Sequence, residues 1–83
     1  MATESRMTTT QGQSLAYISL YRRLHRESPS EKDMQRYFRV TPPTVHQMVL
    51  QLERKGRIER IPRQPRSNRV LVDEMELPEL QRV

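Results

Sequence analysis

Apolar residues recur with helical spacing near the middle of the chain. Four of them stand at i, i+3, i+4 and i+7, the spacing of one face of an α-helix: Val45, Met48, Val49 and Leu52. Thr41 can act as the N-cap, and Pro42 suits the first helical position, where a missing N–H costs nothing. Gly56 suits the left-handed residue that ends a helix. The pattern therefore predicts a helix between Thr41 and Gly56 with one face on a core.

The opposite face of this predicted helix carries no acidic residue. We expect these residues to point away from the core: Pro43, Thr44, His46, Gln47, Leu50, Gln51 and Arg54. Leu50 has two interpretations, since an outward apolar residue can lie in a partner interface or stand alone on the surface. His46 likewise fits either a binding role or a simple solvent-exposed position.

A longer proline-free stretch predicts a first helix from Gln11 to Arg26. Its apolar arc contains these residues: Leu15, Tyr17, Ile18, Tyr21 and Leu24. Arg22, Arg23 and Arg26 are expected to face solvent or phosphate. The Ser28-Pro29 pair then interrupts the helix.

A second, shorter helix is predicted directly afterwards. Ser30 and Asp33 have the spacing of a capping box, which opens a helix that continues to about Tyr37. Met34 and either Tyr37 or Phe38 should anchor it on the core. The few residues from Phe38 to the next N-cap allow only a tight turn, so the second and third helices form a helix-turn-helix.

The residues after Gly56 predict a β-hairpin. Four β-branched residues flank a polar, proline-containing loop at residues 62–68: Ile58, Ile61, Val70 and Val72. An arginine stands at every third position through this region: Arg54, Arg57, Arg60, Arg63, Arg66 and Arg69. A period of three matches neither face of a strand, so these side chains cannot all point in one direction.

Together these elements predict a mainly α fold with a small β-hairpin, a three-helix winged helix-turn-helix at residues 10–72. We expect residues 1–9 to form a flexible arm and residues 73–83 to form a flexible acidic tail. With 83 residues and a hydrophobic content of 34%, the chain should form one small domain with a modest core.

Basic charge is concentrated in the predicted domain. Residues 10–72 contain thirteen Lys and Arg against five Asp and Glu, a net charge of +8, whereas residues 73–83 have a net charge of −3. Thirteen of the fifteen basic residues in the chain are arginines, whose planar guanidinium binds phosphate in two-pronged fashion. This balance favours nucleic acid as the partner, with a merely solvated basic surface as the alternative.

The composition argues against several other classes of protein. The chain has no cysteine, and it has neither a run of about 18 apolar residues nor the apolar core of a signal peptide. Its two histidines have no thiolate or local aspartate beside them. We therefore expect no catalytic or metal site, no cofactor, no small-molecule substrate and no membrane contact. The expected location is the cytoplasm, in association with the nucleoid.

The third predicted helix carries a recognisable motif. Residues 41–46 read Thr-Pro-Pro-Thr-Val-His and residues 53–58 read Glu-Arg-Lys-Gly-Arg-Ile. The sequence resembles the N-terminal winged helix-turn-helix domain of the LexA repressor family, which has Ser-Pro-x-Thr-Val-His and Glu-x-Lys-Gly-x-Ile there. The resemblance covers residues 10–72 and is loose in the first helix, where the family's glycine near Arg26 and proline at Ser28 are absent. The chain ends where the family's self-cleavage site and protease domain would begin, so neither self-cleavage nor a DNA-damage response is expected.

The resemblance implies that the exposed N-terminal half of the third helix reads the DNA major groove. The implied base-reading residues are Pro43, Thr44, His46 and Gln47. Gln47 can bond an adenine edge with both amide groups, Thr44 can contact a thymine methyl or a phosphate, and His46 can donate to guanine or phosphate. Pro43 replaces the family's usual polar residue, so the target sequence is expected to differ.

The expected contacts to the DNA backbone come from the end of that helix and from the hairpin. They are Gln51, Arg54, Arg63, Arg66, Asn68 and Arg69. The prediction is a protein that binds double-stranded DNA sequence-specifically as a small transcription regulator of the repressor type. A homodimer on DNA is one option, because a single module of this size gives limited affinity.

Two alternatives to DNA binding stay open at this stage, and RNA binding is the weaker of them because no stacking aromatics are displayed in a row on the predicted strands. The fold can serve as an adaptor that binds a protein through Leu50 and residues 75–80. The acidic tail can screen the basic surface, act only as a solvated segment, or place Leu77 and Leu80 against the first helix or a second chain.

Overall fold

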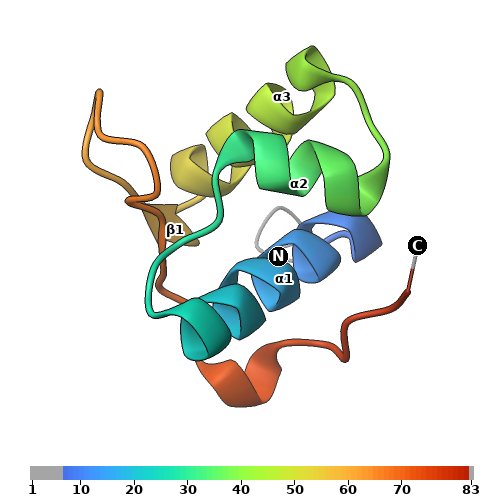
Figure 1. The fold of residues 1–83 in the computed structure, drawn as a ribbon. Helices are drawn as coiled ribbons and strands as arrows, with labels where there is room; N and C mark the ends of the chain where they lie inside the picture. The colour runs from blue at the N-terminus through green and yellow to red at the C-terminus, as the bar shows by residue number, and fades with distance from the viewer. Residues whose placement is uncertain (1–6, 83) are drawn as a thin grey trace.

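Three helices and a two-stranded antiparallel hairpin follow one another along the chain, as the sequence predicts (Figure 1). The computed structural model describes residues 7–82. Its elements are α1 (Thr9–His25), α2 (Glu31–Phe38), α3 (Pro42–Arg54), β1 (Ile58–Glu59), β2 (Arg69–Val70) and the 3-10 turn η2 (Glu74–Glu76). The winged helix-turn-helix fold is therefore confirmed. None of the helices within residues 7–82 is long and apolar enough to cross a membrane.

All three helices and the first strand contribute to the core. Its buried residues in the described part of the chain are Leu15, Ile18, Met34, Val45, Val49, Leu52 and Ile58. The predicted apolar stripe of α3 is confirmed, with Met48 at its half-buried edge. The predicted arc of α1 is wrong at Leu24, which is 69% exposed. Leu24 follows Leu15 by about two and a half helical turns and so points to the opposite side of the helix.

The starts of the helices follow from local sequence. Ser30 Oγ accepts a hydrogen bond from Asp33 N (3.0 Å) and Asp33 Oδ2 accepts one from Ser30 N (3.0 Å), which confirms the predicted capping box. A similar box of Thr8 and Gln11 opens α1, so this helix begins two residues earlier than predicted. Of the arm predicted at residues 1–9, residues 1–6 lie outside the described part, while Met7 packs against the core.

The ends of the helices use left-handed residues. Gly56 follows α3 with a φ of 71°, as its position in the sequence predicts. Arginines take the same conformation after the other two helices, with a φ of 62° at Arg26 and 57° at Arg39. A side chain in this region costs roughly 1–2 kcal/mol, a cost that glycine avoids. The structure therefore holds strain at two positions where glycine would be relaxed.

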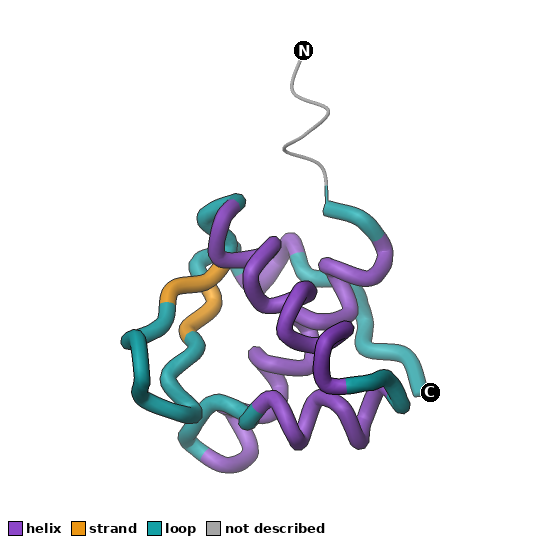
Figure 2. The backbone as a smooth tube through the Cα atoms, turned by 90° about the horizontal axis from the view of Figure 1, so that it is seen from above, coloured by secondary structure: helices purple, strands orange, loops and turns teal. Residues whose placement is uncertain are grey.

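The hairpin, residues 58–70, is called the wing below. Its two strands make only two residue pairs, Ile58 with Val70 and Glu59 with Arg69. The loop between the strands is much longer than the strands themselves (Figure 2). Ile58 fixes the base of the wing to the core, but strand pairing alone does not fix the position of the loop.

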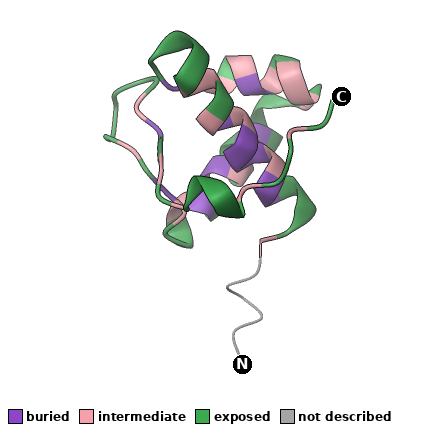
Figure 3. Ribbon diagram, turned by 90° about the horizontal axis from the view of Figure 1, so that it is seen from below, coloured by how far each residue is buried: buried purple, intermediate pink, exposed green. Residues whose placement is uncertain are grey.

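The segment after β2 lies along α1 (Figures 1 and 3), and its end reaches α2, where the Tyr37 hydroxyl donates to Gln81 O at 2.7 Å. Leu77 packs against the core, and the ring of Pro78 lies so close to Gly12 that a Cβ added there would be 3.0 Å from its Cγ. The Gln13 side chain accepts a hydrogen bond from Gln81 N (2.7 Å). For Leu77, the sequence left open packing on the first helix or pairing with a second chain. The structure shows packing on the first helix. The flexibility of the acidic tail stays a prediction.

We expect Arg39→Gly to raise the free energy of unfolding by roughly 0.5–1 kcal/mol. Glycine adopts positive φ without steric cost, and this gain should exceed the entropy that glycine adds to the unfolded chain. The matched control is Arg36→Gly, because Arg36 is exposed but lies inside α2, where glycine should cost about 1 kcal/mol. Urea unfolding of both variants measures the two changes. A loss of stability in Arg39→Gly would contradict the strain at this position.

Candidate nucleic-acid interface

The first half of α3 presents its side chains to solvent. The four residues predicted to read bases are all exposed: Pro43, Thr44, His46 and Gln47. Val45 between them is fully buried and anchors this part of the helix, so its neighbours must point outward. The Thr44 hydroxyl lies 2.9 Å from that of Thr41, the N-cap residue. The structure therefore brings the four residues together on one surface.

The end of α3 continues this surface. Gln51 and Arg54 are exposed and lie about one and two turns after Gln47 on the same side of the helix. No ion pair or hydrogen bond joins the Arg54 side chain to another described residue. Leu50 is half-buried rather than fully outward. This side of α3 therefore offers amide and guanidinium donors along its length.

One carboxylate approaches the surface from a neighbouring helix. Glu31 Oε2, at the start of α2, lies 3.6 Å from His46 Nδ1 and 3.8 Å from Arg60 Nη1. The sequence predicted that the outward face of α3 lacks acidic residues, and the periodicity of α3 could not indicate a carboxylate contributed by α2. Since the pair is solvent-exposed, Glu31 can orient His46 but adds little to stability.

Arg60 holds the base of the wing beside α3. Its Nε donates to Glu53 Oε1 at 3.1 Å, and the same guanidinium lies beside Glu31. Glu53 belongs to α3 and Glu31 to α2, so Arg60 joins both helices to the strand end. The sequence did not predict this role for Arg60. Arginines at every third position fit no strand face, so the spacing gives no orientation for its side chain.

Arg66 turns from the wing loop toward the helices. Its Nη1 lies 3.0 Å from Asp33 Oδ2 and 3.6 Å from Glu27 Oε2, and it donates to the Tyr21 hydroxyl at 3.1 Å. The backbone N–H of Ser30 chiefly, together with the Arg66 charge, holds the pKa of Asp33 below its ordinary value against the opposing effect of burial. Arg66, a predicted backbone contact, is therefore engaged within the domain.

The other three predicted wing residues have different surroundings. Arg63 is exposed, and no ion pair or hydrogen bond joins its side chain to another described residue. Arg69 is exposed and pairs with Glu59 of the opposite strand at 2.7 Å. Asn68 is only 6% exposed, and its backbone carbonyl accepts from Arg22 Nη1 at 3.0 Å. The structure thus places Arg63 and Arg69 on the outside of the wing and the Asn68 side chain inside it.

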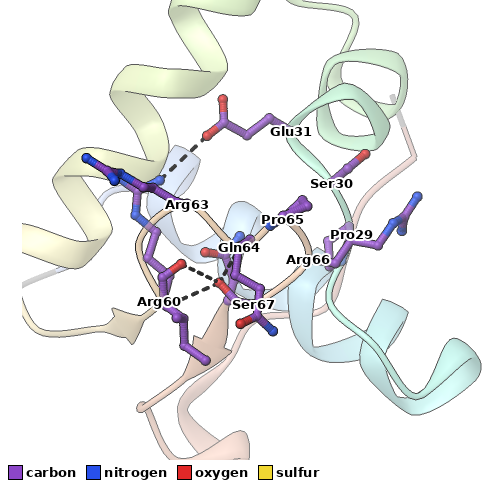
Figure 4. A pocket seen from close by; sticks show the side chains of 11 residues that line it. Pro29, Ser30, Glu31, Arg60, Arg63, Gln64, Pro65, Arg66 and Ser67 are labelled. Carbon is purple, nitrogen blue, oxygen red and sulfur yellow. Dashed lines mark hydrogen bonds and ion pairs between the residues drawn. The ribbon is translucent and has the colours of Figure 1, made fainter.

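A cleft of about 330 Å³ separates the wing loop from the start of α2 (Figure 4). Pro29, Ser30 and Glu31 line one side, and residues 60–61 and 63–68 line the other. Arg60 and Arg66 bridge its two sides through the contacts with Glu31 and Asp33. The wing loop is therefore held near the helices by Arg60, by Arg66 and by the contact of Arg22 with Asn68, without filling the space between them.

An exposed third helix with a basic hairpin beside it defines a winged helix-turn-helix protein of the DNA-binding class. A family model described as the LexA DNA binding domain matches residues 4–67. The chain belongs to this family, which confirms the resemblance found in the sequence.

Two curated relatives give the scale of the similarity. The LexA repressor of Thermosipho africanus (strain TCF52B) is 39% identical over 61 residues, which are 74% of this chain and 31% of that protein. The LexA repressor of Thermosipho melanesiensis is 37% identical over 62 residues, 75% of this chain and 31% of that protein. The chain therefore spans about a third of the length of these relatives, and the shared part carries the DNA-binding domain.

Asp33→Asn should lower the free energy of unfolding at pH 7 by about 1–2 kcal/mol, because it removes the charge that Ser30 N and Arg66 stabilise. The pKa of Asp33 is lowered by folding, so this contribution is present above the ordinary carboxyl pKa near 4. It is lost as the pH falls through the lower, folded-state pKa. Urea unfolding of both proteins from pH 7 to pH 2 should show the difference vanish in acid.

The matched control for this series is Glu27→Gln. Glu27 lies beside the same guanidinium, but its side chain is 53% exposed, so removing its charge should change stability by less than about 0.5 kcal/mol. A stability difference for Asp33→Asn that stayed constant down to pH 2 would show that the charge of Asp33 is not what stabilises the fold.

Proposed function

We propose that the chain binds double-stranded DNA sequence-specifically, with α3 in the major groove and the wing on the backbone, as a module of transcription regulation. One observation carries this proposal. The exposed first half of α3, without an acidic residue of its own, lies next to a wing with arginines on its outer side. A helix fits the major groove, and an adjacent basic hairpin can then reach the phosphates that border it.

The side chains on α3 have the chemistry of base recognition. Gln47 can donate to N7 and accept from the amino group of an adenine, and Thr44 can pack its methyl against a thymine. His46 can donate to a guanine, with Glu31 beside Nδ1 to favour the orientation in which Nε2 faces outward. Pro43 offers only apolar contact. These roles predict a mixed target that includes adenine and thymine.

The backbone contacts follow from which side chains are exposed. Gln51 and Arg54 lie along α3, and Arg63 and Arg69 lie on the wing. Arg54 and Arg63 are the strongest candidates, because their guanidinium groups make no ion pair with other described residues. Arg69 must exchange its contact with Glu59 for a phosphate. Asn68 is too buried to reach DNA through its side chain, so the proposal does not include it.

The adaptor alternative has less support. Its expected contacts were Leu50 and residues 75–80, of which Met75 is 91% exposed. Leu50 is half-buried, and Leu77 packs within the domain, so neither is available as an exposed apolar anchor.

The proposal is tested by selecting bound sequences from random duplex DNA with the 83-residue chain. We expect enrichment of a short motif, because three polar side chains on α3 can contact bases. Two inverted copies of the motif about 10 base pairs apart would indicate that two chains bind as a dimer. The absence of any enriched motif would contradict sequence-specific binding.

Gln47→Ala should weaken binding to the selected site by roughly 1–3 kcal/mol and binding to random duplex by far less, because it removes a base contact. Arg63→Ala is its counterpart: it should weaken both complexes alike and reduce the salt dependence by about one counterion. Fluorescence anisotropy at several salt concentrations measures the affinity and the salt dependence of each variant. For the wild type, we expect log affinity to fall against log salt with a slope of about −4 to −5. A flat wild-type slope, or equal losses on both DNAs for Gln47→Ala, would rule out this arrangement.

A further inference from the structure

The wing loop contains two successive turns with the same residue order. Pro62-Arg63 and Pro65-Arg66 each place proline before an arginine with positive φ, 65° at Arg63 and 57° at Arg66. This is the order of a type II turn, in which glycine is usual at the second position. Arginine at both positions raises the local energy, and such strain persists only where the surroundings hold it. The two arginines therefore have similar backbone conformations, but their side chains make different contacts.

Arg66 contacts the helices through several acceptors. Its guanidinium meets Asp33 at 3.0 Å, the Tyr21 hydroxyl at 3.1 Å and the Ser28 carbonyl at 3.5 Å. These acceptors lie on α1, on the junction between α1 and α2, and in the first turn of α2. Asp33 is itself held by the backbone N–H of Ser30. The guanidinium therefore docks on groups whose positions the helices already fix.

The positive charge of Arg66 is balanced by carboxylates within the domain. Two carboxylates, those of Asp33 and Glu27, are within 3.6 Å of its Nη1. A phosphate would have to displace these carboxylates to bind the same guanidinium. Arg63, three residues earlier, is exposed and has no such partner among the described residues. The structure thus distinguishes a docked arginine from a free one within the same loop.

The strands cannot perform the docking, because they make only two residue pairs at the base of the wing. Within the loop, Gln64 N donates to Ile61 O (3.1 Å), and Ser67 Oγ donates to Gln64 O (2.8 Å). These bonds fix the shape of the loop but not its position relative to α3. Arg60 fixes the base of the loop, and Arg22 holds the backbone carbonyl of Asn68 next to β2. Across the cleft, Arg66 is the contact that fixes the tip.

We propose that Arg66 is a positioning residue for DNA binding: it latches the tip of the wing to the junction of α1 and α2 so that Arg63 meets the DNA backbone in register with α3. The inference rests on the proposed function and deepens it. It replaces the expected role of Arg66 as a phosphate contact. Its physical basis is preorganisation, since a wing fixed before binding loses less conformational entropy on the DNA.

The test compares Arg66→Gln with Arg63→Gln in the 83-residue chain. The same residue is introduced at two left-handed positions of one loop, so the backbone cost is matched. Tyr21→Phe removes one hydrogen-bond acceptor of Arg66 while keeping the aromatic ring. This variant tests the same contact if Arg66→Gln does not fold. The readouts are affinity for the selected duplex at several salt concentrations and hydrogen exchange of the Gln64 amide in the free protein.

The latch predicts different results for the two arginines. Arg63→Gln should make the salt slope shallower by about one unit and leave the exchange of the Gln64 amide unchanged. Arg66→Gln should leave the slope unchanged, weaken binding about three- to tenfold, and speed that exchange. Tyr21→Phe should act in the same direction as Arg66→Gln, and the double variant should be no weaker than Arg66→Gln alone.

Two outcomes overturn the latch. One is a slope change of about one unit in Arg66→Gln with unchanged exchange, which would make Arg66 a phosphate contact. The other is unchanged affinity and exchange in both Arg66→Gln and Tyr21→Phe. Failure of the proposed function looks different, because wild type and Arg63→Gln would then bind DNA without salt dependence or sequence preference.

Discussion

The fold depends on one small core to which α1, α2, α3 and β1 all contribute. In a chain of this length few apolar side chains can be fully buried, so each element is oriented by only one to three of them. Val45, Val49 and Leu52 occupy the inward face of α3, and Ile58 brings the wing back onto the same core four residues after the helix ends. Gln47 is exposed because the opposite face of α3 is buried, and no further interaction is needed to turn it outward.

The acidic residues of the domain are placed mainly to hold basic side chains. Each of these pairs joins a carboxylate to a wing arginine: Glu31 and Glu53 with Arg60, Glu27 and Asp33 with Arg66, and Glu59 with Arg69. The charge that remains without a carboxylate partner includes Arg54 on α3 and Arg63 on the wing. Ion pairs therefore both shape the wing and select which of its arginines face outward. Apart from Asp33, which also accepts a hydrogen bond from Ser30 N, the carboxylates of these pairs are exposed enough to add little stability, so their effect is mainly one of geometry.

What could be predicted from the sequence is local. The stripe of α3, the box of Ser30 and Asp33, and the turn at Gly56 depend on residues within a few positions of one another, so spacing alone reveals them. The contact of Arg66 with Tyr21 joins residues 45 positions apart, and no periodicity encodes it. The same holds for the docking of Leu77 on the core and for the burial of Asn68. The candidate surface on α3 was therefore predictable, whereas the internal role of part of the wing was not.

In the proposed complex, DNA contacts the first half of α3 and the outer side of the wing. The most direct measurement is the amide chemical-shift change in the ¹⁵N-labelled chain as the selected duplex is added. We expect the largest changes at residues 43–47 and at Arg63, and small changes in the part of α1 that the C-terminal segment covers, around Gln13 and Ala16. The largest changes around Gln13 and Ala16, with α3 unaffected, would contradict the proposed complex.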